Sequence, residues 1–111
     1  DGVLQNDVSE EVWKIWRADV NYCPPNGESL AELDRRVRQA LDEIIDESRD
    51  QNIVVVSHVS PIKAAIAWAV GIDVSSSWRM LLDRGSISRI EVSPTGPKLR
   101  SFNDTAHLLE L

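Results

Sequence analysis

The sequence has few of the features that mark a specialised class of protein. Its single cysteine, Cys23, cannot form an internal disulfide, and one cysteine with two histidines cannot fill a structural zinc site without several carboxylates. Basic residues number 12 against 18 acidic ones, and the net charge of −6 disfavours nucleic-acid binding through a basic surface. We therefore expect a reducing, cytoplasmic setting, with no nucleic-acid partner and no bound metal.

Long apolar runs are also absent. The longest apolar stretch, residues 62–72, is too short to cross a bilayer and contains Lys63, so we expect no contact with a membrane. Residues 1–5 lack the basic and apolar regions of a signal peptide. The 111 residues are the length of one small domain, and because the chain opens on Asp1 we expect a processed protein or part of a longer one.

Hydrophobic periodicity predicts two helices in the first half of the chain. A short helix is expected over Ser9–Ala18, followed by a loop rich in proline and glycine. Ser29 and Glu32 have the spacing of a capping box, which opens a longer helix. The apolar stripe of that helix comprises Leu30, Leu33, Val37, Leu41 and Ile44.

Charged residues on the other face of the longer helix are spaced for ion pairs. Glu32 and Arg36 are four residues apart, as are Asp34 and Arg38. We interpret them as a solvated surface rather than a binding patch.

The run Ile53–Val56 has the composition of a strand. It is β-branched and shows no alternation with polar residues, which is typical of a parallel strand buried on both faces. It ends at His58, and the next residues predict a helix with Ser60 as its cap and Pro61 at its first position.

The remainder predicts an antiparallel hairpin, with strands over Ser86–Val92 and Lys98–Phe102. The predicted fold class is therefore α/β, with part of a doubly wound, mostly parallel sheet flanked by helices and a C-terminal hairpin. Only three strands are found, so part of the sheet is expected to be missing. The exposed edge would favour association with another segment or with a second copy as a homo-oligomer.

His58 is the candidate reactive group, because open α/β sheets bind ligands beyond the carboxyl ends of their strands. Imidazole is suited to proton transfer or charge stabilisation near neutral pH. The backbone N–H groups of Val59 and Ser60, at the start of the next helix, predict a seat for an anionic substrate. The position alone equally allows a structural histidine.

Other catalytic layouts find less support. The sequence has no G-x-S-x-G elbow, and Ser57 and Ser60 are too close to His58 for an ordinary triad, so a serine hydrolase is the weaker alternative. Neither a Walker loop nor a dinucleotide fingerprint occurs, so no nucleotide cofactor is expected.

Taken in order, several motifs resemble the histidine phosphatase superfamily, which includes phosphoglycerate mutase-like phosphatases. These motifs are Pro25–Ser29, the helix with Arg36, the strand ending in Ser57-His58, the helix after Pro61, and Asn103–Leu108. The resemblance covers essentially the whole chain, residues 1–111, but corresponds to the C-terminal portion of a family member.

The resemblance implies a phosphomonoester hydrolase that forms a phosphohistidine on a small phosphorylated substrate. His58 matches the family's second histidine, which stabilises the phosphoryl charge. Asp1 stands in the place of the general acid, while Val59 replaces the usual glycine. No Arg-His-Gly motif occurs, so the nucleophile is expected in an N-terminal segment outside these residues.

Two alternatives stay open. A non-catalytic binding or interaction module on the same scaffold would explain the missing Arg-His-Gly motif and Val59. A phosphoglycerate mutase-type phosphotransferase would use the same histidines. Choosing between phosphatase and mutase depends on pocket residues that control the access of water.

Overall fold

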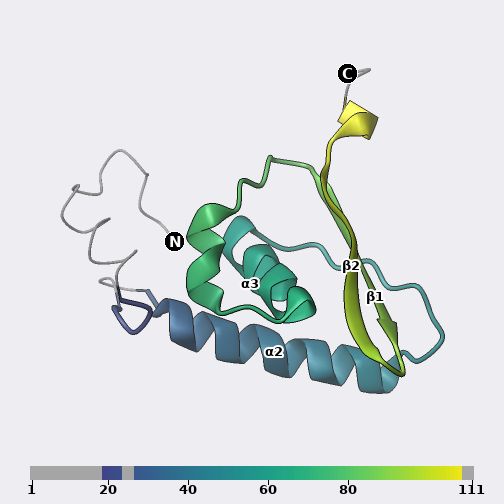
Figure 1. The fold of residues 1–111 in the computed structure, drawn as a ribbon, viewed down its shortest axis with the longest axis horizontal. Coiled ribbons are helices and arrows are strands. Elements are labelled where there is room, and N and C mark those ends of the chain that lie inside the picture. Colours follow the sequence, from purple (N-terminus) through teal and green to yellow (C-terminus); the bar gives the residue numbers. More distant parts are fainter. Residues whose placement is uncertain (1–18, 24–26, 109–111) are drawn as a thin grey trace.

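The computed structural model of the chain describes residues 19–23 and 27–108. In Figure 1, the central helix α3 has α2 below it, a short 3-10 helix on one side and a β-hairpin on the other. In chain order the elements are α2 (Leu30–Glu47), α3 (Val59–Val70), η2 (Val74–Arg79), β1 (Ile87–Ser93), β2 (Gly96–Asp104) and η3 (Ala106–Leu108). The helix predicted over Ser9–Ala18 lies outside the described residues.

Helix α2 begins as the capping box predicts. Ser29 is the N-cap, and its Oγ accepts a hydrogen bond from the backbone N–H of Glu32 at 3.1 Å. The predicted apolar stripe is buried at Leu30, Leu33 and Val37 and half-buried further along, at Leu41 and Ile44. The stripe turns α2 toward α3, and the two helices are in contact.

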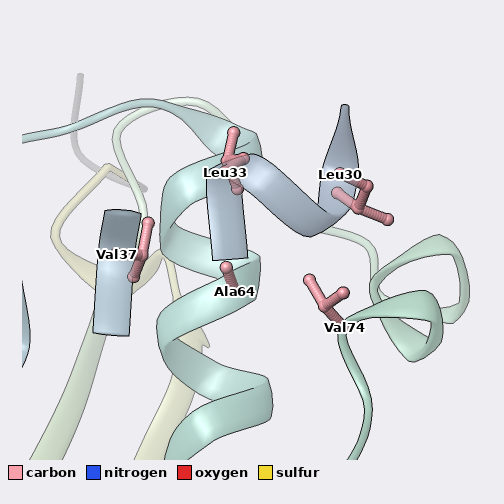
Figure 2. Close-up of a cluster of buried hydrophobic side chains, with 5 residues drawn as sticks. All are labelled: Leu30, Leu33, Val37, Ala64 and Val74. Carbon is pink, nitrogen blue, oxygen red and sulfur yellow. The ribbon is translucent and has the colours of Figure 1, made fainter. Parts of the chain in front are cut away.

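The core forms where α2, α3 and η2 meet. Figure 2 shows the buried cluster of Leu30, Leu33, Val37, Ala64 and Val74. Ala64 and Ala67 of α3 have no exposed surface. Small side chains at these positions let neighbouring elements approach the α3 backbone closely, so the position of α3 is fixed from several sides.

The C-terminal hairpin is confirmed. Strands β1 and β2 pair antiparallel, from Ile87 opposite Asp104 to Ser93 opposite Gly96. Gly96 follows the turn with φ of 114°, a conformation that glycine adopts without strain. β1 begins and ends one residue later than predicted, and β2 is longer than predicted at both ends, because the ladder continues to the residues that flank the turn and to Asp104.

The expectation of a buried strand at Ile53–Val56 is wrong for this chain. Residues 51–58 belong to no helix and no sheet, and β1 and β2 form the only sheet of the described residues. Val54 and Val56 are 90% and 91% exposed. A strand needs a neighbour to accept its hydrogen bonds, and the described residues offer this segment none.

Replacing Ser29 with alanine should lower the free energy of unfolding by about 1 kcal/mol, because the N–H of Glu32 loses its acceptor. The measurement is urea unfolding followed by far-UV circular dichroism. Ser76→Ala, a half-buried serine in η2, is the control and should have a smaller effect. Equal effects of the two substitutions would contradict the capping role.

Candidate functional site

His58 stands at the N-terminus of α3 with its side chain exposed to solvent. It is the N-cap residue in an extended conformation, its backbone C=O accepts the N–H of Ile62 at 3.1 Å, and its side chain forms no capping hydrogen bond. The helix therefore begins at Val59, two residues before the predicted start. Pro61 is accommodated because its missing N–H falls in the first turn, where no intrahelical acceptor exists.

The backbone beside His58 has N–H groups without intrahelical acceptors. The N–H groups of Val59 and Ser60 lie in the first turn of α3, and both residues are exposed. First-turn N–H groups lack intrahelical acceptors, and the helix dipole adds partial positive charge there. His58 therefore immediately precedes two backbone N–H groups of the kind that bind anions at helix N-termini.

Lys63 adds a cation one turn further along α3. It is four residues after Val59, so the two residues share one side of the helix. Its side chain is partly buried, and this loss of water lowers the pKa of Lys63 from its ordinary value. A partly desolvated ammonium group near the first turn would reinforce the attraction of an anion.

Arg36 does not pair with Glu32, contrary to the sequence prediction. It instead reaches back to Glu28, with Nη2 2.6 Å from Oε1 and Nε 3.5 Å from Oε2. The hydrogen bond and the negative charge of Glu28 raise the pKa of Arg36. A guanidinium that contacts both oxygens of a carboxylate is held more strongly than one in a single-point ion pair along the helix. The contact connects the loop before α2 to the helix.

The second predicted pair on α2 is confirmed. Arg38 Nε lies 3.0 Å from both carboxylate oxygens of Asp34. The pair is partly exposed, so its contribution to stability is small, at most about 1 kcal/mol.

Asn103, the first residue of the motif Asn103–Leu108, holds the loop before β1 by contacting Asp83. The side-chain oxygen of Asn103 accepts the backbone N–H of Asp83 at 2.9 Å, and its amide nitrogen donates to Asp83 Oδ2 at 3.0 Å. Asn103 has φ of 54°, a conformation that asparagine adopts more readily than most residues. The sequence motif indicated this segment, but its partner, 20 residues away, was not predicted.

His107 also contacts the loop before β1. Its Nε2 lies 2.7 Å from the carbonyl oxygen of Gly85. In Figure 1, η3 lies at the far end of the hairpin, away from the start of α3 where His58 stands. The contact with Gly85 agrees with a structural role for His107.

Asp104 completes the turn into η3. Its Oδ1 accepts the N–H of Ala106 at 3.0 Å, and its Oδ2 is 3.4 Å from Arg89 Nη1. The backbone hydrogen bond, assisted by the charges of Arg89 and His107, lowers the pKa of Asp104 below its ordinary value of 3.8. Asp104 therefore acts as a local cap that holds the end of β2 to η3.

Some predicted components cannot be placed. Asp1, the predicted acid, lies outside the described residues. In the part of the chain that is described, no three metal-ligating side chains lie close enough to hold an ion. Over the same residues, no helix has both the length and the apolarity that a membrane crossing requires.

Comparison with known proteins identifies the family. Residues 3–105 match the histidine phosphatase superfamily (branch 1), so the chain belongs to this superfamily, and the resemblance seen in the sequence is confirmed. The chain is 36% identical to phosphoserine phosphatase 1 of Hydrogenobacter thermophilus over 113 residues, covering 98% of the chain and 54% of that protein. It is also 35% identical over 89 residues to the probable phosphoglycerate mutase GpmB of Yersinia enterocolitica. This match covers 76% of the chain and 41% of that protein.

Solved structures agree with this assignment. A phosphoserine phosphatase variant from Entamoeba histolytica, in complex with phosphoserine, superposes with a TM-score of 0.82 and 25% identity over 98% of the chain. The α/β fold class is thereby confirmed. The chain spans only 57% of that structure. It is also 35% identical over 99 residues, 88% of the chain, to a bifunctional protein of Mycobacterium tuberculosis, and this match covers 27% of that protein.

Replacing Asn103 with aspartate should destabilise the hairpin in a way that added salt relieves, whereas the effect of alanine should not depend on salt. Both changes remove the donor to Asp83; alanine also removes the acceptor of the Asp83 N–H, whereas aspartate keeps that acceptor but sets a second carboxylate beside Asp83. We expect a loss of about 1 kcal/mol for alanine at any salt concentration and a loss for aspartate that shrinks as salt is added. Thermal unfolding at low and high salt measures both, and a loss for aspartate that is insensitive to salt would contradict the repulsion.

Replacing Asp104 with asparagine should flatten the acid dependence of stability. Because folding lowers the pKa of Asp104, its stabilising effect is present above its ordinary value of 3.8 and is lost as pH falls through the folded value. The fall in melting temperature between about pH 7 and about pH 2.5 should be smaller in Asp104→Asn. Asp42→Asn, which removes one exposed carboxylate from α2, controls for net charge. Identical falls in wild type and Asp104→Asn would contradict the role of Asp104.

Proposed function

We propose that this chain carries the second-histidine half of a histidine phosphatase that hydrolyses small phosphomonoesters through a phosphohistidine. In this proposal residues 1–111 are one domain, the C-terminal portion of a phosphoglycerate mutase-like fold, and the nucleophilic histidine comes from a segment outside them. The single observation that carries the assignment is the exposed imidazole of His58, directly before the first-turn N–H groups of Val59 and Ser60.

The proposed reaction has two displacements. The nucleophilic histidine nitrogen attacks phosphorus, the P–O ester bond breaks, and the leaving oxygen takes a proton from the general acid. Water then attacks the phosphohistidine, the P–N bond breaks, and inorganic phosphate leaves. His58 and the N–H groups of Val59 and Ser60 would donate to the phosphoryl oxygens in both steps, where negative charge must be stabilised.

Val59 occupies the position of a glycine in the family motif. Its side chain is partly exposed, so the start of α3 accommodates the valine without burying it. The backbone N–H of residue 59 is present with either residue. We therefore retain Val59 and Ser60 as substrate-binding residues through their main chain.

Asp1 stays a prediction as the general acid, because it lies outside the described residues. An acid is required to protonate the departing oxygen, and a carboxyl group in a phosphate pocket is suited to that task. The cytoplasmic setting predicted from Cys23 likewise stays a prediction.

The substrate class follows from the relatives. The Entamoeba histolytica structures were solved in complex with phosphoserine and with 3-phosphoglyceric acid, which are both small phosphomonoesters bearing a carboxylate. We propose a substrate of this size for the present chain. A carboxylate-bearing substrate would also benefit from the cation of Lys63 near the first turn of α3.

A second candidate function is phosphoryl transfer of the mutase type, favoured by the 35% identity to GpmB. A mutase returns the phosphoryl group to an organic hydroxyl, whereas a phosphatase passes it to water. Incubation with 3-phosphoglycerate separates the two, because inorganic phosphate accumulates only in hydrolysis. The third candidate, a non-catalytic module, is favoured by the absence of Arg-His-Gly and predicts neither product.

The test uses a fusion in which this chain replaces its matching part of Hydrogenobacter thermophilus phosphoserine phosphatase 1. The fusion should hydrolyse phosphoserine, and His58→Gln should lower kcat about a hundredfold or more by removing a stabiliser of phosphoryl charge. His107→Gln is the matched control, because a glutamine amide can still donate to Gly85, and its kcat should stay within about threefold.

The chain without the fused segment should show no hydrolysis of an aryl phosphate, since the nucleophile is absent in this proposal. Turnover by the chain alone that disappears in His58→Gln would place a nucleophile within residues 1–111 and contradict the proposal. Equal activity of the two fusion variants would remove His58 from the mechanism. Intact mass and circular dichroism of each variant confirm that the compared proteins are folded.

A further inference from the structure

Lys63 differs from the other lysines and arginines of the described residues. Every ion pair in that part of the chain uses an arginine, and none uses Lys63. The side chain of Lys63 is half-buried by its own chain. The other unpaired cations of the described residues are all exposed, and they are Arg35, Arg79, Arg84 and Lys98. Lys63 therefore holds a charge that the described chain neither pairs nor leaves fully in water.

Helix α3 places Lys63 one turn behind the two residues that are proposed to bind phosphate through their main chain. Lys63 follows Val59 by four residues and Ser60 by three, and these are the two spacings at which helical side chains are neighbours. Helical side chains lean toward the N-terminus of their helix. The ammonium group of Lys63 is therefore carried toward the first turn of α3, at about 5 Å from the helix axis.

A cation at this place is suited to a second anionic group of a substrate. The first-turn N–H groups point along the helix axis toward the proposed phosphoryl site, whereas Lys63 lies to one side of them. Burial disfavours the charged form of Lys63 and lowers its pKa, and a bound carboxylate would favour the charged form again. Val59, on the same side of α3, is 43% exposed and offers an aliphatic surface to a short carbon chain.

We propose that Lys63 is a specificity-determining residue that binds a carboxylate of the substrate while His58 and the first-turn N–H groups bind the phosphoryl group. The preferred substrate is then a phosphomonoester whose short carbon chain carries a carboxylate near the phosphoryl group. Phosphomonoesters of the same size without a carboxylate are discriminated against, because they leave Lys63 unpaired. The inference rests on the proposed function for the phosphoryl site and adds the side chain that selects among phosphomonoesters.

The experiment compares phosphoserine with phosphoethanolamine, which lacks only the carboxylate, in the fusion with the Hydrogenobacter thermophilus phosphatase. Lys63→Met removes the charge but keeps an unbranched side chain. It should lower the ratio of kcat/KM for phosphoserine to kcat/KM for phosphoethanolamine about tenfold. Lys63→Arg keeps the cation and should retain most of the ratio. Lys98→Met is the matched control, because Lys98 is an exposed lysine of β2, and its ratio should stay within about threefold.

Equal losses on the two compounds in Lys63→Met, or an unchanged ratio, would overturn the inference, because the ammonium group would then serve the phosphoryl group or the fold. Calorimetric titration of the same variants gives the ratio from dissociation constants, so the inference is tested without turnover. Selective binding that depends on Lys63 but is followed by no hydrolysis would contradict the proposed function alone. Hydrolysis that requires His58, with a ratio independent of Lys63, would contradict the specificity role alone. A fusion that binds neither compound would contradict both.

Discussion

Helix α3 is held in place by the packing of its smallest side chains. Ala64 and Ala67 have no exposed surface, and α3 contacts α2, η2 and β2. A larger residue at either alanine would push a neighbouring element away, at a cost of about 1–3 kcal/mol. Because His58 caps this helix, the direction of its imidazole and of the first-turn N–H groups depends on that close packing.

The same packing leaves the preceding segment without a partner. The core lies where α2, α3 and η2 meet, and residues 53–56 are neither in this cluster nor among the hydrophobic residues packed against it. Burying a valine fully is worth about 1.5–3 kcal/mol, so the exposure of Val54 and Val56 leaves this stabilisation unused in the described chain.

Polar contacts hold two loops against the helices and the hairpin. Arg36 ties the loop before α2 to the helix through Glu28, and Asn103 ties the loop before β1 to the end of β2 through Asp83. These contacts are exposed, so each adds little to stability. Their effect is to fix the geometry of segments that the small core cannot reach.

Local signals in the sequence were sufficient for several elements. Ser29 with Glu32 located the start of α2 because a cap and its donor are close in sequence, and the stripe of Leu30, Leu33 and Val37 identified its buried face. The order of motifs also located His58 at the entry to a helix. The partner of Arg36 was misassigned, because helical spacing offered Glu32 while the folded loop brought Glu28 closer.

The sequence by itself determined where α2, α3 and the hairpin lie and which family motifs are present, because these depend on short-range patterns. Whether the apolar run Ile53–Val56 is buried was decided only by the tertiary structure. Its β-branched composition favours a strand, but burial depends on neighbouring segments. The described residues provide no neighbouring strand for this run. The contact of His107 with Gly85, 22 residues away in sequence, was likewise decided by the tertiary structure, since no local pattern encodes it.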